Sequence, residues 1–130
     1  MSGSSGRSRS AERSVSDHPY DTAVDEVLQA AHDVREALQA WDEDLLEARR
    51  QRARRDPFVA IVDSGIGQGA RDRRVAVDEA IAGYRSAVMR LRAAAVLTLV
   101  DGEGMTLTAA AKLLKISRQM ASRLYATGQT

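Results

Sequence analysis

Apolar side chains recur along residues 20–55 at alternating intervals of three and four positions. The stripe consists of Val24, Val27, Ala31, Val34, Leu38, Trp41, Leu45 and Ala48. Heptad spacing held over more than three repeats is typical of a coiled coil or a packed helix pair. We therefore expect one helix from Tyr20 to about Arg55, with Asp21 or Thr22 as its N-cap. A helix this long with one narrow stripe needs a partner.

A second stripe with the same spacing predicts a second long helix, from about Asp72 to Val100. It consists of Val77, Ile81, Tyr84, Val88, Leu91 and Ala95. The similar lengths favour antiparallel pairing within the chain, between chains, or both. Near its end the apolar character widens over residues 93–100, where we expect the C-terminal residues to dock. The dimerisation residues that we expect from the two stripes are Val27, Val34, Leu38, Trp41, Leu45, Ile81, Tyr84, Val88 and Leu91.

Residues 56–71 separate the two stripes and read as a linker. Pro57 ends the first helix, and glycines follow at positions 65, 67 and 69. The run FVAIV at 58–62 is compatible with a short strand or with an apolar plug. The glycines lack the spacing and the following lysine of a phosphate-binding loop. We expect a flexible linker here.

Two short helices are expected near the C-terminus. Thr106 is a good N-cap for a helix that ends near Leu114. A turn over residues 115–117 follows, and Ser117 caps a second helix that runs to about Tyr125 or Ala126, where Gly128 stops it. Helices joined by so short a turn cross steeply and need small residues at the crossing. Ala110 and Ala111 supply them, and we expect Leu114, Ile116, Ala121 and Leu124 to face inward, with Met120 filling space beside Ala121.

The order of residues in this segment resembles the helix-turn-helix family of DNA-binding proteins. The matching positions are Ala111, Leu114, Lys115, Ile116 and Ser117, then Arg118, Gln119, Ser122, Arg123 and Leu124. The resemblance covers about 21 of the 130 residues, and the long helices are not part of it. The turn position that the family usually fills with glycine is Lys115, where a left-handed backbone costs ~1 kcal/mol.

A helix fits the major groove of B-DNA, where its N-terminal residues meet base edges. Arginine binds guanine and glutamine binds adenine through paired hydrogen bonds. We therefore expect the base-reading residues to be Arg118, Gln119, Ser122 and Arg123. The residues expected at phosphates, which position a protein without reading sequence, are Thr108, Lys112, Lys115 and Ser117.

The net charge of +1 conceals strong segregation of charge. Residues 20–48 contain nine acids and one base, and the segment Arg49–Arg55 then has five arginines in seven residues. After Glu103 there is no acid, whereas four basic residues occur. Three roles remain open for Arg49–Arg55: contact with DNA phosphates, pairing with an acidic partner helix, or plain exposure to solvent.

Several classes of function lack support in the sequence. The chain has no cysteine, and His18 and His32 have no accompanying metal ligands, so we expect neither a metal site nor a cofactor. No nucleophile–base or carboxylate pair stands out, so we do not expect an enzyme. Aromatic residues make up 4%, too few for base-stacking platforms. The longest apolar run is eight residues, so we expect no membrane partner.

The sequence therefore predicts an all-α protein with two long coiled-coil-like helices followed by a C-terminal helix-turn-helix. We expect a disordered tail over residues 1–19, a helical hairpin and dimerisation region over 20–100, and a DNA-binding unit over 101–130. The expected function is that of a cytoplasmic, nucleoid-associated, dimeric transcriptional regulator that inserts helix 117–126 into the major groove of double-stranded DNA. The alternative is a coiled-coil scaffold that binds another protein through its long helices.

Overall fold

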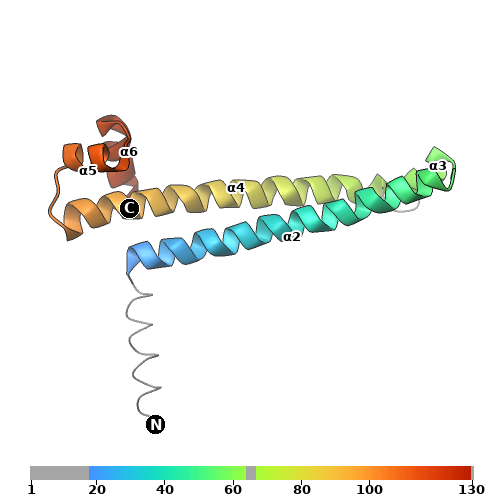
Figure 1. Cartoon of the computed structure of the whole chain (residues 1–130), viewed down its shortest axis with the longest axis horizontal. Helices are drawn as coiled ribbons and strands as arrows, with labels where there is room; N and C mark the ends of the chain where they lie inside the picture. The colour runs from blue at the N-terminus through green and yellow to red at the C-terminus, as the bar shows by residue number, and fades with distance from the viewer. Residues whose placement is uncertain (1–17, 64–66, 130) are drawn as a thin grey trace, which may run out of the picture. The chain divides into compact units, whose positions relative to one another are not determined.

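The computed structural model describes residues 18–63 and 67–129, and the regular structure in these ranges is helical throughout (Figure 1). The elements are α2 (Pro19–Ala53), α3 (Phe58–Ile61), α4 (Gly67–Leu97), the π-helical turn η2 (Thr98–Gly102), α5 (Leu107–Leu114) and α6 (Arg118–Gln129). The prediction of an all-α chain with two long helices is confirmed. The predicted tail over residues 1–19 lies almost entirely outside the described residues.

Helix α2 begins earlier than its expected N-cap and ends before Pro57. Pro19 occupies the first helical position, where a missing N–H costs nothing, and the Thr22 N–H already donates to the His18 carbonyl at 3.0 Å. The expectation of a cap at Asp21 or Thr22 is therefore wrong. At the other end Arg55 adopts a left-handed backbone (φ 64°), and the Asp56 N–H donates to the Gln51 carbonyl at 3.1 Å.

The predicted linker over residues 56–71 is too long. Residues Phe58–Ile61 form a one-turn helix, neither of the two forms considered for this run, and α4 begins at Gly67, five residues before Asp72. Glycine signals a break in a sequence, but in a helix it costs only ~1 kcal/mol relative to alanine. Packing along a 31-residue helix outweighs that cost, so Gly67 and Gly69 lie in its first turn.

The described chain divides into two compact units, and each long helix contributes to both. The first unit holds residues 18–28 and 86–129, and the second holds Gln29–Arg85. In the second unit the Arg73 Nε donates to Asp44 Oδ2 at 2.9 Å, which ties α4 to α2. Val77 and Ile61 are its buried apolar side chains, so this unit has a thin core.

In the first unit, the start of α2 runs antiparallel to the end of α4. A surface hollow there has Pro19 and Ala23 on one wall and Ala93 and Leu97 on the other. Within the same unit the Arg90 Nε donates to Glu26 Oε2 at 2.6 Å. The α2 and α4 segments of this unit are thus joined within one chain, which is one of the three modes of pairing that the sequence left open.

The core of the first unit lies at the apolar end of α4. Ala93, Val96 and Leu124 form its buried centre, and Leu124 comes from α6. The partly buried side chains packed around it are Val100, Leu107, Ile116, Met120 and Tyr125. The expectation that the C-terminal residues dock where α4 becomes broadly apolar is confirmed, and this docking positions the candidate site.

Candidate nucleic-acid interface

The C-terminal helix pair, α5 and α6 with the turn between them, begins at a capped helix end. The Thr106 Oγ1 accepts a hydrogen bond from the Ala109 N–H at 3.1 Å, as expected of an N-cap. Helix α5 ends at Leu114, also as expected. The local sequence signals were sufficient here because a cap depends only on neighbouring residues.

Lys115 makes the turn between α5 and α6 with a left-handed backbone, φ 57° and ψ 44°. Its N–H donates to the Lys112 carbonyl, and the next N–H, of Ile116, donates to the Ala111 carbonyl at 3.0 Å. This arrangement closes the helix but places a β-carbon in a conformation that favours glycine, at a cost of ~1 kcal/mol. The Lys115 side chain is exposed at the corner.

Helix α6 begins at its predicted cap but extends beyond its predicted end. The Ser117 Oγ accepts from the Met120 N–H at 2.9 Å, and the helix runs to Gln129. The expectation that Gly128 stops the helix is wrong, because Gly128 lies in its last turn against Leu97. A β-carbon at Gly128 would lie 2.9 Å from the Leu97 Cγ, so the glycine permits a close approach to α4.

Alanines set the spacing between the two helices. Ala110 and Ala121 are completely buried, and Ala111 is nearly so. Such small side chains let the two helix backbones approach closely. Ile116 and Met120 pack against the core from the edge. Leu114 was expected to face inward, but it is exposed at the rim of a hollow that Ile116 and Leu124 also line.

The polar residues proposed from the sequence lie on the outside of this pair. The exposed side chains are those of Arg118, Gln119, Ser122 and Arg123 on α6, and of Thr108, Lys112, Lys115 and Ser117 on α5 and the turn. Ala121 and Leu124 of the same helix are buried. Helix α6 is therefore fixed through one face and presents its polar residues to solvent on the other.

One hydrogen bond links a predicted base-reading residue to a predicted phosphate contact. The Arg118 Nε donates to the Thr108 Oγ1 at 3.0 Å, across the crossing of α5 and α6. The bond uses the inner nitrogen of the guanidinium and leaves the two terminal nitrogens directed elsewhere. Residues ten positions apart carry no local signal for such a contact, so sequence reasoning missed it.

Asp101 attaches the C-terminal half of α6 to the π-helical turn. Its carboxylate accepts from the Tyr125 hydroxyl at 2.9 Å and from the Gln129 Nε2 at 3.4 Å. The hydrogen bond to Asp101 raises the pKa of Tyr125 above its ordinary value, because deprotonation would remove the donor. This contact, also missed in the sequence, orients the C-terminal half of α6, whereas the Arg118–Thr108 bond lies at its first residue.

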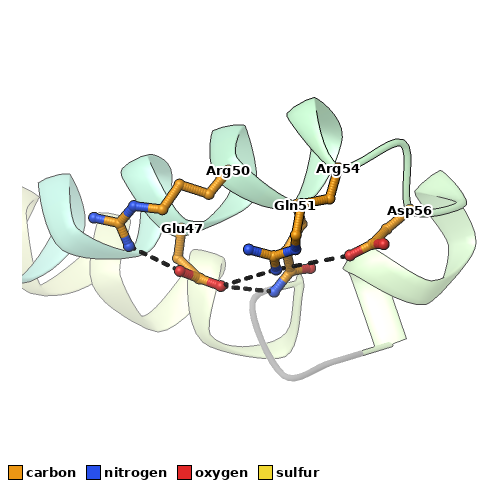
Figure 2. A network of polar contacts seen from close by, with 5 residues as sticks. All are labelled: Glu47, Arg50, Gln51, Arg54 and Asp56. Atoms are coloured by element: carbon orange, nitrogen blue, oxygen red, sulfur yellow. Dashed lines mark hydrogen bonds and ion pairs between the residues drawn. The ribbon is translucent and has the colours of Figure 1, made fainter.

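The arginine-rich segment Arg49–Arg55 has a different environment. Glu47 accepts hydrogen bonds from Arg50 at 2.8 Å and from Gln51 at 3.3 Å (Figure 2). Arg54 lies 3.5 Å from Glu47 and 3.8 Å from Asp56, so it has an acid on either side. The hydrogen bond from Gln51, then those from the arginines, hold the pKa of Glu47 below its usual value. Part of the charge of this segment is therefore compensated within the chain.

The residues proposed for dimerisation differ in exposure. The partly buried ones are Val27, Val34, Trp41, Ile81, Val88 and Leu91. Leu38 and Leu45 are 40% and 52% exposed, and Tyr84 is exposed as well. The chain's own helices thus cover part of this set and leave two leucines of α2 open to solvent.

No group of three or more potential metal ligands occurs among the described residues, and none of their helices is long and apolar enough to cross a membrane. Comparison of the chain with protein-family models, with characterised proteins and with solved structures found no match. The exposed basic face of the C-terminal helix pair remains the strongest candidate site.

Proposed function

We propose that the C-terminal helix pair binds double-stranded DNA, with the N-terminal half of α6 in the major groove. The observation that carries this proposal is the exposure of Arg118, Gln119 and Arg123 on a helix whose opposite face is anchored by Ala121 and Leu124. Side chains of these types make paired hydrogen bonds to guanine and adenine. Their rigid support favours recognition of a defined base sequence.

Electrostatics favour the same partner. No acid follows Glu103, and Lys112 and Lys115 lie at the exposed edge of the pair, where phosphates would flank the groove. The Arg118–Thr108 bond holds one base-reading side chain in place before binding, which lowers the entropy lost on binding. One helix pair offers little surface, so the working form is a dimer acting as a transcriptional regulator on a palindromic site.

Selection of bound duplexes from a random pool, followed by salt titration of the selected site, tests the proposal. We expect affinity to fall steeply with salt, and Lys112→Ala to reduce the slope of log K against log salt by ~0.9. Arg85→Ala, at an exposed arginine on α4, serves as the charge-matched control and should leave the slope unchanged. Absence of duplex binding by the parent protein at low salt would reject the proposal.

A coiled-coil scaffold is the second candidate, favoured by the exposed Leu38 and Leu45 on α2. Such a protein would bind through its long helices and tolerate alanine at Arg118 and Arg123. The selection experiment separates the two, because a scaffold enriches no duplex sequence.

A further inference from the structure

Helix α2 has an apolar face that the second unit does not cover. Leu38, Leu45 and Leu46 are 40%, 52% and 43% exposed. Leu45 and Leu46 line an open surface hollow whose other lining residues are Asp42 and Arg49. At 100° per residue these side chains share one face of α2, about 140° around the helix from the side on which Asp44 pairs with α4. A helix with two apolar sides has two neighbours.

The charges around this hollow match a second copy of the same surface. Asp42 and Arg49 lie three and a half positions before and after the midpoint of Leu45 and Leu46. A two-fold axis through that midpoint would therefore place Asp42 of one copy opposite Arg49 of the other, twice. The same axis stacks Leu45 on Leu46 between the two pairs. This self-complementarity is the property that an isologous interface requires.

The wider charge pattern of α2 fixes the direction of pairing. Residues 29–45 hold five acids and one base, whereas residues 46–56 hold five bases and two acids. A parallel pair would place like charges side by side, and an antiparallel pair places the arginine-rich segment of each copy along the acidic part of the other. Glu47 and Asp56 pair with Arg50 and Arg54, two of the five arginines in the segment, and the second copy supplies acids for the others.

We infer that two copies of this chain pair antiparallel through α2, with a two-fold axis between Leu45 and Leu46 and with Asp42 of each copy opposite Arg49 of its partner. This interface gives a location to the dimer of the proposed function and rests on that dimer, but it does not require DNA. Its test omits DNA, so its failure is distinguishable from a failure of the helix pair to bind duplex.

Sedimentation of the full chain over a range of concentrations provides the first test. Asp42→Arg and Arg49→Asp should each weaken the dimer on the order of tenfold, since both pairs become repulsive. The double variant Asp42→Arg/Arg49→Asp should return to the parent value, because both pairs are restored. Circular dichroism checks that each variant remains helical. A monomeric parent, or a double variant as weak as the singles, would overturn the inference.

Cysteine cross-linking provides the second test, because the chain has no cysteine of its own. In the inferred pair the two copies of residue 46 lie about one residue apart along the helices, whereas the two copies of residue 38 lie fifteen residues, ~22 Å, apart. Disulfides need Cα atoms within about 7 Å. Leu46→Cys should therefore cross-link under mild oxidation and Leu38→Cys should not. Equal cross-linking of both would indicate parallel pairing and reject the inferred axis.

Discussion

Two basic regions of this chain differ more in their surroundings than in their number of charges. The arginine-rich segment is the denser, yet Glu47 and Asp56 lie within ion-pair distance of Arg50 and Arg54. The C-terminal helix pair has fewer cations but no acid in either helix. Charge that is paired within the chain is less available to a polyanion than charge that is not. The sparser region is therefore the better candidate for DNA, and the denser one for a protein surface.

Enlarging Ala121 should change the free energy of unfolding more than any other substitution proposed here, because Ala121 is fully buried in the C-terminal helix pair. Ala121→Leu inserts a branched side chain where the alanine is fully buried, and should lower the free energy of unfolding by ~3 kcal/mol. The matched change Ala53→Leu, at an exposed position beside the arginine-rich segment, should have no comparable effect. Chemical denaturation measures both. Equal losses would mean that the crossing of α5 and α6 is not tightly packed.

Removing single arginines compares the two basic regions directly. Arg118→Ala should cost about 1–3 kcal/mol of discrimination between the selected site and a site changed at one base. Arg50→Ala should leave that discrimination intact, because its guanidinium is held by Glu47. Competition binding with the two duplexes gives the measurement. A result in which Arg50→Ala loses specificity and Arg118→Ala does not would reverse the assignment of the regions.

Lys115→Gly should improve folding and weaken binding at the same time. The left-handed backbone favours glycine, so we expect a gain of ~1 kcal/mol in the free energy of unfolding. Loss of the exposed ammonium should lower the salt slope of duplex binding by ~0.9. Lys112→Ala is the control, with the same loss in slope but no gain in stability from the turn. Tighter binding by Lys115→Gly would exclude Lys115 as a phosphate contact.

Removing the negative charge of Glu47 should make the arginine-rich segment more available to DNA, as the C-terminal helix pair already is. Glu47→Gln keeps the shape of the side chain but removes the charge that Arg50 and Arg54 share. Non-specific duplex binding should then tighten by roughly twofold at low salt. Glu79→Gln, at an exposed acid on α4, controls for the change in net charge. Equal tightening by both variants would show that net charge, and not the local network, is responsible.

The pH dependence of stability should run in opposite directions at Glu47 and at Tyr125, with small amplitudes because both side chains remain partly exposed to solvent. The folded pKa of Glu47 is depressed, so its contribution is present above the unfolded value of about 4.3 and is lost as pH falls through the folded value. The folded pKa of Tyr125 is raised, so its contribution is present below about pH 10 and is lost as pH rises through the folded value. Thermal melts of the parent, Glu47→Gln and Tyr125→Phe across pH test both. A parent and variant with the same pH profile would contradict the assignment for that residue.

The sequence predicts the helices well where the signals are local. Thr106 and Ser117 cap the helices that they were expected to cap, because an N-cap needs only the next three residues. The ends of helices were less predictable. Gly128 signals a stop, yet the contact with Leu97, 31 residues earlier, keeps it helical. No local rule includes that contact.

In the candidate site, too, local features were predictable from the sequence and contacts between distant residues were not. Residue types and spacing were enough to propose the exposed set on α6, but not the Arg118–Thr108 bond at the start of the helix or the Asp101–Tyr125 bond in its C-terminal half. In α2, hydrophobicity placed Leu38 on the packed stripe, although it is 40% exposed. Asp44 is less exposed than Leu45 because it lies against α4, where it pairs with Arg73. A prediction based on apolar residues alone does not place an acid at such a contact.

The shared hollow at the start of α2 has a consequence for the order of folding. Its walls come from Pro19 and Ala23, from the end of α4, and from Thr127 and Gly128 in the last turn of α6. Contacts over about a hundred residues form late, since the entropy of closing so large a loop must be overcome first. During synthesis this hollow is therefore completed only after residues 127 and 128 have left the ribosome.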